Sequence, residues 1–227
     1  MQVLMLAGGR GTRMGDMTKT VQKTMIDVRG KPVLQYQIEF FKRQGITDIL
    51  LSVGYLKEQV MEFFGDGSRF GVKIDYVVED EPLGTAGPIR LAAKKIRGTF
   101  VMINADTLID AKVTDVVKFH KEAGAPVTVM LVKSDETKSR GMVKMSGDRI
   151  SEFVEKPDED TLSYINGGLY VMEPEIVNFV PEGFCMLEKD VFPKLAADGK
   201  LAGWTGDARI MDMGTPDRLK KTREDWK

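Results

Sequence analysis

The chain has 227 residues, and its 42% hydrophobic content is enough to build one full α/β core. Its 33 lysines and arginines nearly balance its 34 aspartates and glutamates, which argues against a nucleic-acid binder that relies on a basic face. A single cysteine, Cys185, and the absence of any run near the roughly 18 apolar residues of a membrane span indicate a soluble, cytoplasmic protein with no membrane partner.

In the first half of the chain, short apolar runs alternate with amphipathic helical patterns. The runs expected to form buried strands are residues 3–7, 49–53, 73–78, 100–103 and 127–132. The helices expected between them are residues 32–44, 56–64, 85–96 and 113–123. Alternation of this kind is typical of a mostly parallel sheet with helices on both faces. We therefore predict an α/β three-layer sandwich with a mostly parallel central sheet.

The second half of the chain is less regular. Gly147-Asp148 lies between two apolar segments, residues 142–145 and 150–154, which predicts a β-hairpin. A strand is expected over residues 166–172, and helices over residues 187–196 and after Pro216. Because no linker, repeat or low-complexity segment interrupts the chain, we expect a single domain over residues 1–227.

Three unusual segments follow predicted strands of the first half. They are the glycine-rich loop from Gly8, residues 79–87, and Asn104-Ala105-Asp106. Sheets of this class bind ligands at the carboxyl ends of their strands. The sequence therefore predicts one binding site where these three segments meet.

The strongest local signal is the loop Leu6-Ala7-Gly8-Gly9-Arg10-Gly11-Thr12-Arg13-Met14. Glycines let backbone N–H groups approach an anion closely, and the two arginines add forked donors for phosphate oxygens. A Walker A loop does not fit, because Gly-Lys-Ser/Thr is missing. The dinucleotide fingerprint fits only in part, because its third glycine would fall at Met14. Taken alone, the loop is compatible with a phosphate site or with a flexible turn that carries surface arginines.

Further motifs follow this loop in a fixed order. They are Gln22-Lys23-Thr24, Glu81-Pro82-Leu83-Gly84-Thr85-Ala86-Gly87, Asn104-Ala105-Asp106, Glu155-Lys156-Pro157, Asn166-Gly167-Gly168-Leu169-Tyr170 and Asp212-Met213-Gly214-Thr215-Pro216. With these motifs the chain resembles the sugar-phosphate nucleotidyltransferases from Gln2 to about Leu219, and most of all the mannose- and heptose-1-phosphate guanylyltransferases. The resemblance implies the Rossmann-like nucleotide-diphospho-sugar transferase fold. It also implies transfer of a nucleoside monophosphate from a nucleoside triphosphate to a sugar 1-phosphate, with release of pyrophosphate.

The resemblance assigns a role to each matched residue. Arg13, Lys23 and Asp106 are expected to be catalytic, and Asp106 and Asp212 are expected to hold Mg²⁺. The residues expected to bind the nucleotide are Leu6, Ala7, Gly8, Gly9, Arg10, Gly11, Thr12, Arg13, Lys23, Pro82, Gly84, Thr85 and Asp106. The residues expected to bind the sugar phosphate are Glu155, Lys156, Asn166 and Gly167. The nucleotide-binding half is then about residues 1–110 and the sugar-phosphate-binding half about residues 111–227.

Three positions depart from the family pattern. Ala105 replaces a glycine, so we expect its methyl group to lie close to the ribose or the sugar. Gln22 and Thr24 replace prolines, so we expect the loop around Lys23 to be less rigid. The chain also stops soon after the closing motif, so we expect no added β-helix domain and no second, acyltransferase activity.

GTP is the favoured nucleotide, because residues 81–87 and 187–193 resemble the corresponding segments of guanylyltransferases. Loop carbonyls or the carboxylates of Glu79, Asp80 and Glu81 are available to accept hydrogen bonds from guanine N–H groups. The alternatives are a uridylyl- or thymidylyltransferase, and a non-catalytic regulatory subunit that senses nucleotides or sugars. A glycosyltransferase fits less well, because Asn104-Ala105-Asp106 offers one carboxylate instead of Asp-x-Asp. The sequence leaves the oligomeric state open, a homo-oligomer included.

Overall fold

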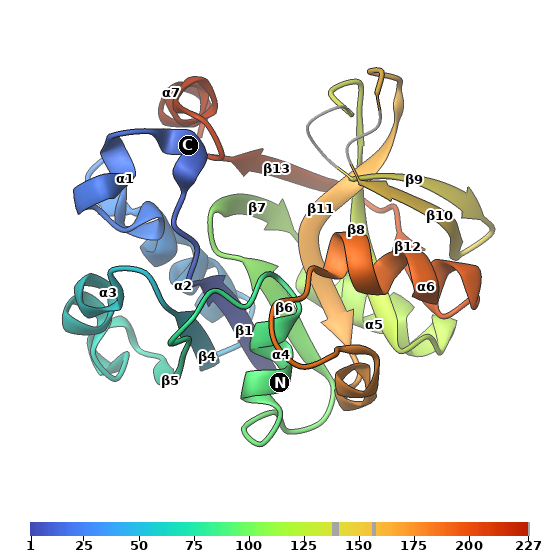
Figure 1. Cartoon of the computed structure of the whole chain (residues 1–227), viewed down its shortest axis with the longest axis horizontal. Helices are drawn as coiled ribbons and strands as arrows, with labels where there is room; N and C mark the ends of the chain where they lie inside the picture. Colours follow the sequence, from blue (N-terminus) through green and yellow to red (C-terminus); the bar gives the residue numbers. More distant parts are fainter. Residues whose placement is uncertain (138–140, 156–157, 227) are drawn as a thin grey trace.

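The computed structural model describes residues 1–137, 141–155 and 158–226, and its centre is a nine-stranded sheet (Figure 1). The strands are β1 (Gln2–Ala7), β2 (Asp27–Val28), β3 (Lys31–Pro32), β4 (Asp48–Val53), β5 (Lys73–Val78), β6 (Phe100–Asn104), β7 (Thr107–Ala111), β8 (Val127–Ser134), β9 (Gly141–Ser146), β10 (Arg149–Glu155), β11 (Ser163–Met172), β12 (Leu201–Trp204) and β13 (Ala208–Asp212). The helices are α1 (Met17–Thr20), α2 (Val33–Arg43), α3 (Lys57–Phe64), α4 (Gly87–Ala92), α5 (Val113–Ala123), α6 (Phe192–Ala197) and α7 (Pro216–Asp225). Short 3₁₀ helices cover Thr12–Met14, Lys23–Met25, Ser68–Phe70 and Pro174–Phe179, and a π-helical turn covers Leu187–Val191.

Strands from the first half of the chain form the parallel part of the sheet, in the order β5-β4-β1-β6. The pairings β4–β5, β1–β4 and β1–β6 are all parallel. Their carboxyl ends therefore meet at one edge of the sheet. The predicted convergence of the glycine-rich loop, the loop after residue 78 and the Asn104 segment at this edge is confirmed.

Strands from the second half are mostly antiparallel, so the expectation of a mostly parallel sheet is wrong there. The order continues as β6-β11-β8-β12-β10-β9. β11 is antiparallel to β6, β8 and β9, and β10 is antiparallel to β9 and β12. Among the described pairings of this part, only β8–β12 is parallel. The difference has a simple cause, because a two-residue turn joins β9 to β10 and no crossover helix separates them.

Helices cover both faces of the sheet, as the alternating pattern predicts. The odd-numbered side chains of β1, such as Val3 and Met5, pack in a core with residues of α2, α3 and α5. Leu4 packs on the opposite face with residues of α4 and α6, which lie in front of the sheet in Figure 1. In the described part of the chain, none of these helices has both the length and the apolar character that a membrane crossing needs.

A separate two-stranded ladder between β7 and β13 was not predicted. Thr107 pairs with Asp212, and Ala111 pairs with Ala208, in antiparallel register. β13 crosses the top of the molecule in Figure 1 and leads into α7. The ladder brings a segment from the end of the sequence beside the strand that follows Asp106.

Several predicted helices differ in length from the observed ones. The helix expected over residues 85–96 is confined to α4, and the helix expected over residues 187–196 begins with the π-helical turn before α6. Pro88 and Pro193 lie in the first turns of these two helices, where a missing N–H is tolerated. The predicted hairpin around Gly147 is confirmed as β9 and β10.

Candidate active site

One cavity of about 820 Å³ opens at the carboxyl ends of the parallel strands. It collects every described residue of the predicted nucleotide site, together with Asp212 and the predicted sugar-side residues Asn166 and Gly167. The predicted residues that line it are Leu6, Ala7, Gly8, Gly9, Arg10, Gly11, Thr12, Arg13, Lys23, Pro82, Gly84, Thr85, Asp106, Asn166, Gly167 and Asp212. Segments far apart in the sequence therefore share one binding volume.

The glycine-rich loop wraps around the base of Lys23. Gly11 has a φ of 64°, in the left-handed region that favours glycine. A Cβ atom on Gly11 would lie 2.9 Å from Thr18 Cγ2 and 3.1 Å from Lys23 Cδ. Gly9 differs, because a Cβ atom there would meet nothing within 4 Å. The loop ends in a single 3₁₀ turn, Thr12–Met14.

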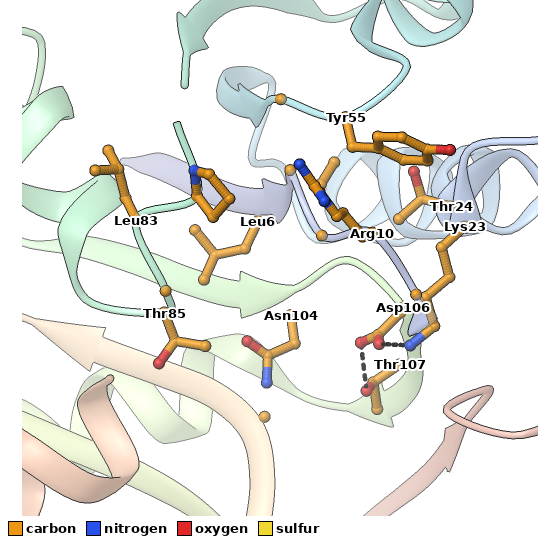
Figure 2. Close-up of a pocket in the computed structure, with 18 of the residues that line it drawn as sticks. Leu6, Arg10, Lys23, Thr24, Tyr55, Leu83, Thr85, Asn104, Asp106 and Thr107 are labelled. Atoms are coloured by element: carbon orange, nitrogen blue, oxygen red, sulfur yellow. Dashed lines mark hydrogen bonds and ion pairs between the residues drawn. The ribbon is translucent and has the colours of Figure 1, made fainter. Parts of the chain in front are cut away.

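Lys23 and Asp106 form an ion pair at the floor of the cavity (Figure 2). The side chain of Lys23 is only 9% exposed, and that of Asp106 is 29% exposed. Burial raises the pKa of the Asp106 carboxyl, but the Lys23 ammonium and, more weakly, the Arg13 guanidinium outweigh it and lower the pKa below its usual value. Asp106 is therefore held in the carboxylate form that a metal ion requires.

Hydrogen bonds hold the loop around Lys23 at Gln22 and Thr24, the two positions where prolines are expected from the family pattern. The fully buried Gln22 side chain donates to the Ala7 carbonyl and accepts from both the N–H and the hydroxyl of Thr24. The Gln22 N–H donates to Gln59 Oε1 at 2.9 Å. These bonds restrain the loop without proline, and the expectation that it is less rigid stays a prediction.

Asp212 lies beside Asp106 because one further backbone hydrogen bond follows the last residue pair of the β7–β13 ladder. The Met213 N–H donates to the Asp106 carbonyl at 3.2 Å. The Asp212 carboxylate accepts from the Gly214 N–H at 2.9 Å, and the Arg218 guanidinium reaches both of its oxygens at 3.0 and 3.1 Å. The two acidic residues assigned to the metal are thus joined through adjacent backbone.

The donor set at Asp106 and Asp212 fits Mg²⁺. This ion takes oxygen ligands, usually one or two carboxylates, and completes its shell with water and substrate phosphates. Across residues 1–137, 141–155 and 158–226 there is no group of three or more His, Cys, Asp or Glu side chains arranged for a metal ion. Two carboxylates beside the glycine-rich loop therefore suit a metal ion that takes its remaining ligands from water and substrate phosphates.

The end of the cavity away from Lys23 is more apolar. Leu6 and Leu83 lie there, with Arg10 between them and the Lys23–Asp106 pair (Figure 2). The Glu79 carboxylate accepts from the Ser52 hydroxyl at 2.8 Å and seats against Gly8, where a Cβ atom would overlap it. Burial raises the pKa of Glu79.

The sequence did not assign Glu188, yet this residue lines the cavity and is only 7% exposed. It accepts a hydrogen bond from the Thr85 hydroxyl, which in turn accepts from the Leu187 N–H at 2.8 Å. Burial raises the pKa of Glu188, and the nearby carboxylates of Asp106 and Asp190 add to this shift. The sequence carries no signal for this acid, because its burial and the π-helical turn that holds it are visible only in the structure.

Residues 184–186 join the two halves of the molecule at the cavity rim. The Cys185 N–H donates to the Leu83 carbonyl at 3.0 Å, and the Ala86 N–H donates to the Cys185 carbonyl at 2.9 Å. Gly84 is required here, because a Cβ atom would lie 2.4 Å from the Cys185 carbonyl oxygen. Phe184, which is 64% exposed, lines the cavity mouth. The loop assigned to the base is thus fixed by a segment of the second half.

The sugar-side residues Asn166 and Gly167 lie in an irregular stretch of β11. Regular pairing with β8 breaks between Asn166 and Tyr170. The Asn166 side chain bridges the break: its amide donates to the Tyr170 hydroxyl at 2.8 Å, and its carbonyl accepts from the Gly168 N–H at 3.0 Å. Glu155 ends β10 and Lys156 lies outside the described residues, so their assignment to the sugar phosphate stays a prediction.

Ala105 does not face the ligand, so this prediction is wrong. The residue is fully buried in the core shared with α2 and α5, and it is not among the residues that line the cavity. Its N–H donates to the Leu6 carbonyl at 3.2 Å. The methyl group therefore fills core space and leaves the binding volume unchanged.

Comparison with known proteins identifies the family of the chain. Residues 2–226 match the model of the family described as "Nucleotidyl transferase". The chain belongs to this family. A nucleotidyl transferase of this kind has the nucleotide-diphospho-sugar transferase fold, in agreement with the resemblance seen in the sequence.

Three individual proteins are similar to the chain over most of its length. "Probable mannose-1-phosphate guanylyltransferase 1" of Oryza sativa subsp. japonica is 36% identical over 223 residues, which cover 95% of this chain and 62% of that protein. HddC from Yersinia pseudotuberculosis complexed with GMP-PN has a TM-score of 0.86 and 28% identity, over 100% of this chain and 99% of that chain. A Bacillus anthracis protein assigned as a glucose-1-phosphate thymidylyltransferase, in complex with a sucrose, has a TM-score of 0.89 and 25% identity, over 98% of this chain and 94% of that chain. The chain thus spans less than two thirds of the length of the curated relative.

Proposed function

We propose that this nucleotidyl transferase moves a nucleoside monophosphate from a nucleoside triphosphate to a sugar 1-phosphate and releases pyrophosphate. One observation carries the proposal: the phosphate loop, the Lys23–Asp106 pair, Asp212 and the β11 irregularity all line one cavity of about 820 Å³. Such a volume lies within the usual range for small-molecule and cofactor sites.

Positioning and charge neutralisation account for the catalysis. An oxygen of the sugar phosphate attacks the α-phosphorus in line with the departing pyrophosphate, and little covalent work falls on the protein. The backbone N–H groups of the glycine-rich loop and the Arg13 guanidinium hold the triphosphate. Lys23 neutralises charge that develops at the α-phosphate, from a position fixed by Asp106.

Asp106 and Asp212 are the residues that would hold Mg²⁺. When bound, the ion supplies electrostatic neutralisation of the phosphate oxygens and orients them. The chain's own contribution is to keep both carboxylates adjacent through the Met213-to-Asp106 hydrogen bond. Within the cavity, Asn166 and Gly167 would then face the sugar.

In this proposal the nucleotide is GTP, and the second substrate is mannose 1-phosphate or heptose 1-phosphate. The names of the curated relatives and the GMP-PN complex of HddC support a guanine nucleotide. Glu79 adds a physical reason, because a half-buried carboxylate beside Gly8 is an acceptor suited to the N–H donors along one edge of guanine. The similarity to the Bacillus anthracis structure supports the alternative of a thymidylyltransferase, so the choice of base is tested directly.

The test is a matrix of nucleoside triphosphates against sugar 1-phosphates, scored by pyrophosphate release with Mg²⁺. We expect GTP with mannose or heptose 1-phosphate to give the highest kcat/KM. UTP or dTTP ahead of GTP would overturn the guanylyl assignment and leave nucleotidyl transfer intact. Absence of turnover with every pair, in a protein that still binds GTP, would favour the regulatory-subunit alternative.

A further inference from the structure

Arg218 pairs with the carboxylate to which the metal ion is assigned. It lies in the first turn of α7, and its Nη1 reaches both oxygens of Asp212 at 3.0 and 3.1 Å. The pair is well protected from solvent, because the side chains of Arg218 and Asp212 are only 21% and 14% exposed. A guanidinium in this position covers carboxylate oxygens that a cation would use.

The same pair forms part of a wall between two cavities. The second cavity, of about 480 Å³, lies against α7. Residues that line both cavities are Arg13, Ile210, Asp212 and Arg218. Arg13 is close by, because a Cβ atom on Gly214 would lie 3.2 Å from its Nη2 and 3.0 Å from Asp212 Oδ1. Arg218 is thus adjacent to the residue assigned to the triphosphate.

The charge balance of the main cavity makes this arginine important. The described basic residues that line it are Arg10, Arg13, Lys23, Lys57 and Arg218. The described acidic residues that line it are Glu79, Asp80, Glu81, Asp106, Glu188 and Asp212. Of the described bases, Lys23 and Arg218 are paired with Asp106 and Asp212, so phosphate groups in this cavity compete with carboxylates for these two cations.

We propose that Arg218 is a phosphate-binding residue that pairs with Asp212 in the free protein. When a divalent cation binds to Asp212, Arg218 leaves this carboxylate and pairs with pyrophosphate or the triphosphate instead. The exchange conserves pairing, because the carboxylate gains the metal ion while the guanidinium gains phosphate oxygens, its best bidentate partners. In the free protein, Arg218 competes with the cation for Asp212. This inference rests on the proposed function, since it takes Asp212 as a metal ligand.

The exchange predicts opposite effects on two ligands. In Arg218→Met, Mn²⁺ alone, followed by electron paramagnetic resonance, should bind at least about threefold more tightly because the competing charge is gone. Inorganic pyrophosphate in the presence of Mg²⁺, followed by calorimetry, should bind about tenfold more weakly, as expected for loss of one charged hydrogen bond. An arginine that only pairs with Asp212 would leave pyrophosphate binding unchanged, so weaker pyrophosphate binding is the outcome that marks a phosphate-binding role.

Arg223→Met is the matched control. Arg223 lies on the same helix, is exposed, donates to the Asp27 carbonyl and lines neither cavity. It loses the same charge, so its affinities for Mn²⁺ and pyrophosphate should stay within about twofold of the wild type.

Each remaining outcome has a definite meaning. Weaker Mn²⁺ binding by Arg218→Met, or unchanged binding of pyrophosphate, overturns the inference. If this variant does not fold, Arg218→Gln replaces it, because glutamine also removes the charge but keeps hydrogen-bond donors. The glutamine variant should bind Mn²⁺ more tightly and pyrophosphate more weakly than the wild type, and failure of either expectation overturns the inference. A wild-type protein that binds neither Mn²⁺ nor pyrophosphate removes the proposed function as well, whereas one that binds both beside an unaffected variant removes only the role of Arg218.

Discussion

The two ends of the cavity are built in different ways. The end assigned to the triphosphate uses loops that directly follow parallel strands, and each loop is a continuous motif of the sequence. The end assigned to the sugar uses an irregular stretch inside β11, and the β7–β13 ladder adds Asp212 from the end of the sequence. The first arrangement needs only strand order, whereas the second also needs an exact register between distant strands. Changes to the two ends should therefore affect different substrates.

The largest expected effect tests whether Asp106, at one end of the cavity, and Asp212, from the β7–β13 ladder, both act at the proposed metal site. Asp106→Asn, in the first region, and Asp212→Asn, from the ladder, should each lower kcat by roughly 10²–10³-fold, because each removes a charge that neutralises the transition state. Pyrophosphate release at saturating Mg²⁺ measures the loss, and circular dichroism checks folding. Asp110→Asn is a control, because Asp110 is exposed in β7 and does not line the cavity. Near-normal turnover of either variant would remove that residue from the metal site.

The second prediction separates the two substrates. Arg13→Ala should raise the KM for the nucleotide, and Lys156→Ala should raise the KM for the sugar 1-phosphate, each by about 10- to 100-fold, as expected for a charged hydrogen bond. The first residue lines the cavity beside the phosphate loop, and the second is assigned by the family motif. Titration of each substrate at saturation of the other measures both constants. Should both variants impair the same substrate and spare the other, the division of the cavity into two ends is wrong.

A smaller effect compares how two glycines of the glycine-rich loop, Gly11 and Gly9, tolerate a side chain. Gly11→Ala should destabilise the protein by about 1–2 kcal/mol, because φ is positive and the new methyl group would overlap Thr18 and Lys23. Gly9→Ala is the matched control, since its Cβ meets nothing within 4 Å. Urea unfolding of the three proteins measures the difference. Equal stabilities of Gly11→Ala and Gly9→Ala would contradict the described loop geometry.

The smallest effect concerns Glu188, which links the base loop to the second half. Because burial raises its pKa in the folded state, the stability from Glu188 is full at low pH and is lost as the pH rises through that raised value. Glu188→Gln does not titrate, and its amide oxygen can still accept from Thr85. The variant should therefore gain stability on the wild type as the pH rises above about 4, the usual range of a glutamate carboxyl. Thermal unfolding across this range measures the gain, with the exposed Glu62→Gln as control. A gain that shrinks as the pH rises would be the opposite of this prediction.

The sequence predicted the end assigned to the triphosphate well because its information is local. Apolar runs located the parallel strands, and glycines and charges at their ends located the site. Family motifs predicted Asp212, but the short β13 has no clear period of its own, so its pairing with β7 was missed. Ala105 was misassigned because a motif gives the position of a residue in the chain and says nothing of the face on which its side chain lies. Glu188 was missed because its role depends on a hydrogen bond to a residue of the other half.

The ladder between β7 and β13 has a consequence for biosynthesis. The ribosome delivers the phosphate loop, Lys23 and Asp106 early, whereas Asp212 emerges only after all the other motifs. Folding during synthesis generally starts from the N-terminal side. Pairing of β13 with β7 is therefore the step that completes the cavity lining, because Asp212 and Arg218 belong to the last segment to be synthesised.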